Sequence, residues 1–253
     1  SAHFVTYSSS MDDGYSPEQN EICELIDSIT NRQLITQHTG TSAETPARYY
    51  DCDYLDYCMN QSGHHGNNHE RAAGAAIDWN LALYRREPHK PVVNGEAWYD
   101  GSATPEQTAQ LGYLSMLSGC CGYTYGAIGQ FDEGALGELM NRKGSEYIKY
   151  LHDFFMDIDE GRALIPMHHL ILNQSTNARD KFVLAATEDK SKYVAFTPWG
   201  RPIQIDFSEI SGNFQGKWFN ATTSEYGSSF PIKGNTAFTS KPPYGQLPSL
   251  LVI

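Results

Sequence analysis

Residues 1 to about 160 alternate between short apolar segments and longer helix-like segments, and this order limits the possible fold more than any other feature. The segments predicted as strands are residues 2–7, 32–38, 91–96 and 119–126. Residues 54–65 are predicted as a further strand with the loop that follows it. The segments predicted as helices are residues 16–30, 67–86, 104–117 and 145–158. Such alternation is typical of βα units in a parallel sheet or barrel.

The helix predicted over residues 16–30 has a marked start and an apolar side. Ser16 is suited to the N-cap and Pro17 to the first helical position. The apolar residues that share one face of this helix are Ile22, Leu25, Ile26 and Ile29.

The sequence changes character near residue 165. From there to the end it consists of short strand-like segments separated by Gly, Pro, Asn and Asp, and no segment has a helical period. This pattern favours a small antiparallel β-sandwich. The expected organisation is therefore an α/β domain over residues 1–162, followed by a β-sandwich domain over residues 163–253.

Charge and composition exclude several kinds of partner. The formal net charge is −12, which makes nucleic acid a poor partner because its phosphates need clustered Lys and Arg. The apolar runs are too short to span a bilayer, so no membrane partner is expected. The five cysteines have no metal-ligand spacing, and a loop histidine that bonds to backbone or solvent is a simpler reading of His64, His65 and His69 than a zinc site.

Polar residues follow each of the five predicted strands. In barrels of βα units, the loops at the carboxyl ends of the strands form the active site. The segments at these positions are "MDDG", "QHTG", "NQSGHH", Glu96 with Trp98 and Tyr99, and "YTYG" with Gln130 and Asp132. Glycoside hydrolysis uses two carboxyl groups that face one pocket, one as acid/base and one as nucleophile. Aromatic rings in such a pocket stack on sugar faces.

Each of these residues also has a simpler reading. A single Glu at a strand end is more often a salt-bridge or capping residue than a catalytic one. Asp12 and Asp13 precede a predicted helix, so they could instead complement its dipole. Polar groups at five successive strand ends favour the functional reading.

The motifs "QLITQHTG", "LDYCMNQSGHH", "KPVVNGEAWYDG" and "LSGCCGYTYGAIGQFD", in this order, resemble those of the apiosidase-like glycoside hydrolase family. The remainder of the chain resembles the β-sandwich that commonly follows this family's (β/α)₈ barrel and that carries a collagen-binding label. The resemblance implies a TIM-type barrel, of which only strands four to eight are present here. An upstream barrel segment or a second chain is therefore expected to complete it, because five strands cannot close a small barrel.

The resemblance also implies roles for individual residues. Glu96 corresponds to the nucleophile, and either Asp12 or Asp13 to the acid/base. No metal and no cofactor is implied. The residues expected to bind the carbohydrate substrate are His38, Gln61, His64, Trp98, Tyr99, Tyr123 (where the family has a His) and Tyr125.

The expected function is a retaining, exo-acting glycoside hydrolase that removes sugars from the side chains of polysaccharides or glycans. Secretion to the cell surface, the periplasm or the medium is implied through the family alone. The alternative is a barrel remnant that binds glycan or matrix without cutting it.

Overall fold

The structure is a computed structural model of the 253-residue chain. It describes residues 3–7, 17–30, 33–38, 45, 47–65, 68–130, 132 and 136–253.

The N-terminal part alternates strands and helices, as the sequence predicts. Its elements are β1 (His3–Tyr7), α1 (Pro17–Ile29), β2 (Leu34–His38), α2 (Ala47–Tyr50), β3 (Cys58–Asn60), α3 (His69–Tyr84), β4 (Val92–Asn94), α4 (Pro105–Met116), β5 (Gly122–Tyr123), α5 (Leu136–Met140) and α6 (Lys143–Asp159). The last strand is much shorter than the predicted 119–126, because the chain leaves the ladder after it pairs with β4.

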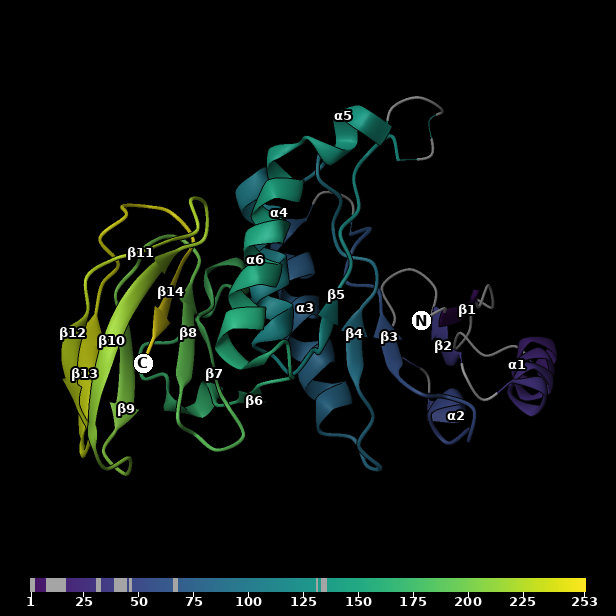
Figure 1. The fold of residues 1–253 in the computed structure, drawn as a ribbon, viewed down its shortest axis with the longest axis horizontal. Helices are drawn as coiled ribbons and strands as arrows, with labels where there is room; N and C mark the ends of the chain where they lie inside the picture. Colours follow the sequence, from purple (N-terminus) through teal and green to yellow (C-terminus); the bar gives the residue numbers. More distant parts are fainter. Residues whose placement is uncertain are drawn as a thin grey trace.

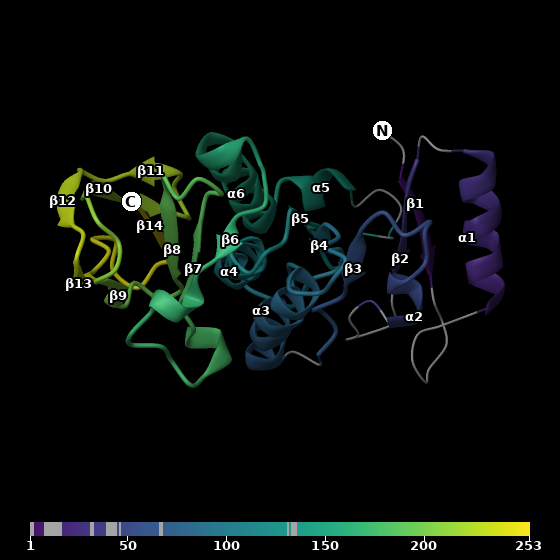
Figure 2. The ribbon, with the colours of Figure 1, turned by 90° about the horizontal axis from the view of Figure 1, so that it is seen from below.

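The strands of this part run parallel and follow one another in chain order (Figures 1 and 2). β1 pairs with β2, and β3, β4 and β5 form a second ladder. The two ladders are joined by the Asp56 amide, which donates to the Ile35 carbonyl (3.0 Å), and by the Thr36 hydroxyl, which donates to the Tyr57 carbonyl (2.6 Å). The carboxyl ends of parallel strands therefore lie at one edge, and the loops that follow them are neighbours.

The helices α3, α4 and α6 lie between the parallel strands and the C-terminal sheets (Figure 1). The start of α3 is capped by Asn68, whose side chain accepts from the Arg71 amide (3.0 Å). The start of α4 is a capping box in which Thr104 and Gln107 bond to each other's backbone, with Pro105 at the first turn. These two caps fix where the loops that lead into α3 and α4 end.

The C-terminal part is antiparallel, as the sequence predicts. Its elements are β6 (Ile165–Pro166), the 3₁₀ turns η1 (His168–Leu170) and η2 (Ala178–Asp180), β7 (Val183–Ala186), β8 (Tyr193–Thr197), β9 (Ile203–Phe207), β10 (Asn213–Asn220), β11 (Glu225–Tyr226), β12 (Phe230–Lys233), β13 (Thr236–Ser240) and β14 (Ser249–Val252). The large sheet has the order β11-β10-β14-β8-β7-β6, with β12 also on β10, and β9 pairs with β13.

The large sheet is buried on both faces. On one face Phe196 stacks on Tyr113 of α4 (ring centroids 5.3 Å apart), and Phe219 contacts Phe154 of α6 (4.7 Å). On the other face Tyr193 packs against Phe207 of β9 (5.0 Å). Because removal of one such buried ring typically costs about 3–5 kcal/mol, these contacts make the sheet a firm support for the helices.

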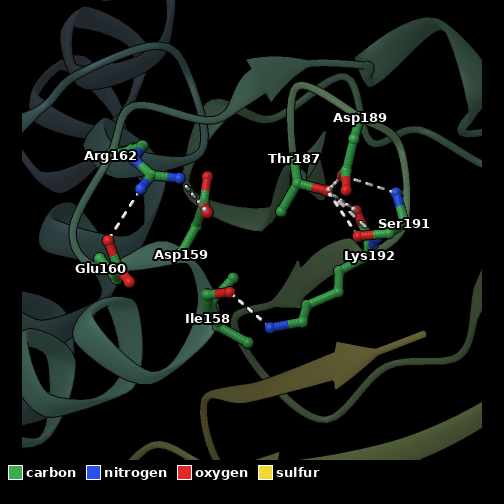
Figure 3. A network of polar contacts seen from close by, with 8 residues as sticks. All are labelled: Ile158, Asp159, Glu160, Arg162, Thr187, Asp189, Ser191 and Lys192. Atoms are coloured by element: carbon green, nitrogen blue, oxygen red, sulfur yellow. Dashed lines mark hydrogen bonds and ion pairs between the residues drawn. The ribbon is translucent and has the colours of Figure 1, made fainter.

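A polar network holds the end of α6 against the β7–β8 hairpin (Figure 3). The Lys192 ammonium donates to the Ile158 carbonyl (2.6 Å), and Arg162 pairs with Asp159 (3.2 Å) and Glu160 (2.8 Å). Within the hairpin, hydrogen bonds from Thr187 and Ser191 lower the pKa of Asp189 to about 2. The exposed ion pairs add little stability, but the bond from Lys192 fixes the helix end to the sheet.

Part of the apolar side of α1 is exposed to solvent, although Cys23 is buried and Ile26 packs against the core. Ile29 is 75% exposed, and Ile22 and Leu25 are also exposed. Helix α1 forms the outer end of the N-terminal part (Figure 2). Among the described residues, none of the helices has the length and apolar character needed to cross a membrane.

Candidate active site

Glu96 lies just beyond β4, where the loops after β3 and β4 are hydrogen bonded to each other. The Gly95 amide donates to the Asn60 carbonyl (2.9 Å), and the Gly63 amide donates to the Glu96 carbonyl (3.0 Å). A Cβ atom on residue 63 would lie 2.7 Å from the Ala97 carbonyl oxygen, so only glycine permits this approach. The backbone of Glu96 is therefore held by its neighbouring loop.

Three side chains donate to the Glu96 carboxylate. His38, at the end of β2, places Nε2 3.0 Å from Oε2. His64, in the loop after β3, places Nε2 2.5 Å from Oε1, and the Tyr99 hydroxyl donates to the same oxygen. The carboxylate thus collects donors from three successive strand ends.

The charge of Glu96 is stabilised by these donors. Its side chain is only 12% exposed, and this burial raises its pKa. The hydrogen bonds from His38, Tyr99 and His64 lower the pKa further than burial raises it, to about 2. Glu96 is therefore ionised at neutral pH. Its contribution to folding is present above the ordinary pKa of 4.5 and is lost as the pH falls through about 2.

His64 forms the solvent side of this cluster. Its backbone has a φ of 57°, in the left-handed region, and its side chain is exposed. The imidazole ring meets the Tyr99 ring edge-on, with centroids 5.1 Å apart. The exposed His64 ring therefore separates the Glu96 carboxylate from solvent on this side.

A buried amide network lies behind Glu96. The Asn94 side chain donates to the hydroxyls of Ser62 (2.8 Å) and Ser115 (2.9 Å), which joins β4 to the loop after β3 and to α4. On β3, Asn60 donates in turn to Asn80 of α3. The sequence prediction missed these residues, although an Asn that ends an otherwise apolar strand, as in "VVN" and "CMN", is a usable signal.

Of the predicted substrate-binding residues, His38, His64 and Tyr99 are brought together around Glu96. Gln61 is buried directly after β3, in the loop whose Gly63 amide donates to the Glu96 carbonyl. Tyr125 lies after β5, and its hydroxyl donates to the buried Asp100 carboxylate (2.8 Å) instead.

Two predicted sugar platforms, Tyr123 and Trp98, pack against other parts of the protein. Tyr123 is in register with Asn94 in the parallel ladder, so the two side chains share a face, and both point to α4. Its hydroxyl accordingly donates to the Thr108 carbonyl (3.3 Å). Trp98 is buried against His69 (5.8 Å), so its ring is covered. Both rings therefore make contacts within the protein, and their role as platforms for the substrate stays a prediction.

The predicted acid/base candidates Asp12 and Asp13 lie outside the described residues, and their role stays a prediction. Within the described part of the chain, no three His, Cys, Asp or Glu side chains gather as they would to hold a metal ion.

The sequence matches two family models in succession. Residues 7–159 match the model described as "Apiosidase-like, catalytic domain", and residues 165–247 match the "Putative collagen-binding domain of a collagenase". No match was found among curated proteins.

Several solved glycoside hydrolases have a similar fold. A family 5 glycoside hydrolase from Bacteroides vulgatus ATCC 8482 superposes with a TM-score of 0.78 at 21% identity, over 92% of this chain and 58% of its own. A structure named only as a glycoside hydrolase superposes with a TM-score of 0.75 at 20% identity, over 93% of this chain and 61% of its own. A GH30 endoxylanase from Clostridium papyrosolvens C71 superposes with a TM-score of 0.55 at 13% identity, over 94% of this chain and 60% of its own. The chain spans about three fifths of the length of these structures, and it has the mixed α/β fold of glycoside hydrolases with a C-terminal antiparallel sheet region.

Replacement of Tyr99 by Phe is expected to raise the pKa of Glu96 from about 2 toward its ordinary value of 4.5, because one donor to the carboxylate is lost. The carboxyl ¹³C chemical shift of Glu96, followed by NMR as the pH is lowered, measures this change. Tyr125→Phe is the matched control, since its hydroxyl bonds to Asp100. Equal pKa values of Glu96 in the wild type and in Tyr99→Phe would contradict the account.

Proposed function

The chain belongs to the apiosidase-like family, and on this premise we propose that it acts in a retaining, exo-acting glycoside hydrolase that removes sugars from the side chains of polysaccharides or glycans. The observation that carries the proposal is the Glu96 carboxylate, ionised and held by three donors at the carboxyl edge of the parallel strands. A nucleophilic carboxylate must be ionised before it attacks, and its low pKa supplies this state.

In this proposal Glu96 attacks the anomeric carbon while an acid donates a proton to the departing oxygen. A covalent glycosyl-enzyme forms, and water then releases the sugar with the same acid acting as a base. Donors already in place around Glu96 restrict the orientation of the attacking oxygen. His64 and Tyr99, which share Oε1, are also positioned to reach a sugar hydroxyl next to it.

We assign the acid/base role to Asp12 or Asp13. The support comes from β1, whose last residue, Tyr7, is paired with His38 in the parallel ladder. Because His38 contacts Glu96, the chain leaves β1 beside the candidate nucleophile, and the two aspartates follow a few residues later.

Replacement of Glu96 by Gln tests the proposed function. The amide keeps the size of the side chain but cannot form the covalent intermediate, so sugar release should fall about 10³-fold or more. A panel of 4-nitrophenyl glycosides and plant polysaccharides, with released sugar as the readout, measures the loss. Glu209→Gln, at an exposed position of the C-terminal part, is the control with the same change of charge.

Undiminished turnover by Glu96→Gln would contradict the assignment of the nucleophile. Glycan binding without sugar release, equal in the wild type and in Glu96→Gln, would favour the alternative in which the chain only binds glycan.

We further propose that β1 to β5 are strands four to eight of a (β/α)₈ barrel, completed by an upstream segment or by a second chain. The exposure of Ile22, Leu25 and Ile29 on α1 supports this, because a barrel helix buries its apolar side against its neighbours. Exposed apolar patches mark surfaces that another segment covers.

Sedimentation velocity tests this second proposal. At micromolar concentration the chain alone should self-associate, and Leu25→Lys with Ile29→Lys should weaken the association, since both side chains are exposed on α1. Leu172→Lys, which changes an exposed leucine in the C-terminal part, is the control. A chain that stays monomeric at every concentration would count against the proposal.

A further inference from the structure

A cavity of about 320 Å³ lies between the loop after β5 and helices α5 and α6. The residues that line it are Tyr125, Ala127, Gln130, Leu136, Leu139, Met140 and Ser145. Its volume is at the lower end of the range of small-molecule pockets, which begins at about 300 Å³.

The cavity borders the Glu96 cluster through Tyr99. The Tyr99 ring packs so closely on Gly126 that a Cβ atom at residue 126 would lie 2.6 Å from its Cε1 atom. Gly126 joins Tyr125 to Ala127, and both of these line the cavity. Tyr99 thus touches the cavity wall with its ring and Glu96 with its hydroxyl.

The described side chains that line the cavity offer few polar groups with which a ligand could form hydrogen bonds. None of the lining residues that the structure describes is charged, in a chain whose net charge is −12. The Tyr125 hydroxyl is bonded to Asp100, and the Ser145 hydroxyl is bonded to the carbonyls of Met140 and Arg142 (2.7 Å each). The Gln130 side chain accepts from the Ala127 amide (3.3 Å), which leaves its own N–H groups to meet a ligand.

Apolar side chains stand exposed at the rim. Leu136 is 64% exposed and Met140 68% exposed, and both also line the cavity. Exposed apolar surface next to a pocket is typical of a site that an apolar ligand covers. A bare sugar would leave these side chains without a partner.

We propose that this cavity is a subsite for an uncharged aryl or alkyl group, the aglycone of a glycoside whose sugar lies at Glu96. The ring or chain would pack between Leu139, Met140 and the Tyr125 ring, with the Gln130 amide donating to one oxygen of the ligand. The proposal rests on the glycosidase function proposed above. It extends the substrate class from the side chains of polysaccharides to glycosides that carry an apolar group beside the scissile bond.

Binding of free 4-nitrophenol, at a pH below its own pKa so that the phenol is uncharged, tests the subsite without any need for turnover. In protein labelled with [methyl-¹³C]methionine, six methyl signals are expected. The Met140 signal, assigned through Met140→Leu, should shift saturably as 4-nitrophenol is added, while the Met59, Met116, Met156 and Met167 signals should stay in place. An unresponsive Met140 signal, or equal shifts of all the methyl groups, would overturn the proposal.

Variants of the exposed rim give a second readout. Leu136→Ser and Met140→Ser change side chains that the fold leaves in solvent, and each should weaken 4-nitrophenol binding by about 5- to 10-fold through lost apolar contact. Met156→Ser, at an exposed methionine near the C-terminal end of α6, is the control and should bind as the wild type does. Unchanged affinity in both rim variants would also overturn the subsite.

The proposed glycosidase function of Glu96 and the proposed apolar subsite can be refuted independently of each other. Glu96→Gln should bind 4-nitrophenol as the wild type does, because Glu96 does not line the cavity. Loss of the subsite leaves the role of Glu96 intact, and undiminished turnover by Glu96→Gln leaves the binding of 4-nitrophenol intact.

Discussion

A carboxylate taken out of water must be offset by hydrogen-bond donors, and the arrangement around Glu96 depends on this requirement. His38, His64 and Tyr99 meet it from three strand ends, which is possible only because parallel strands bring their carboxyl ends to one edge. The result is a carboxylate whose charge is favoured although its side chain is mostly covered. The same three hydrogen bonds stabilise the charge of the carboxylate and hold the carboxylate in one orientation.

The rest of the molecule keeps these strand ends in place. Behind Glu96, the Asn94 amide ties β4 to α4 through Ser115. Helix α4 is in turn packed through Tyr113 on Phe196 of the large sheet, so the C-terminal part supports the helices that support the strands. This continuity of packing gives the β-rich part a structural role whether or not it also binds a partner.

The sequence was sufficient to predict the alternation of strands and helices, the antiparallel second part and the gathering of His38, His64 and Tyr99 near Glu96. It was not sufficient to predict that Tyr123 packs against α4 and Trp98 against His69, because the face that a residue occupies depends on strand register and loop path, which periodicity over two or three residues cannot fix. The bond from Tyr125 to Asp100 was also missed, since it depends on how the loops after β4 and β5 pair. The exposure of Ile22, Leu25 and Ile29 on α1 could not be predicted from their spacing, which shows only that one side of the helix is apolar.

The central claim is that Glu96 forms a covalent bond to the sugar, and trapping of that bond tests it most directly. Treatment of the protein with a panel of 2,4-dinitrophenyl 2-deoxy-2-fluoroglycosides should leave one fluorosugar attached, because the fluorine slows the release of the intermediate more than its formation. Peptide mass spectrometry should then place the added mass on Glu96. A label on a different carboxylate, or turnover of the ordinary glycoside with inversion at the anomeric carbon, would contradict the account.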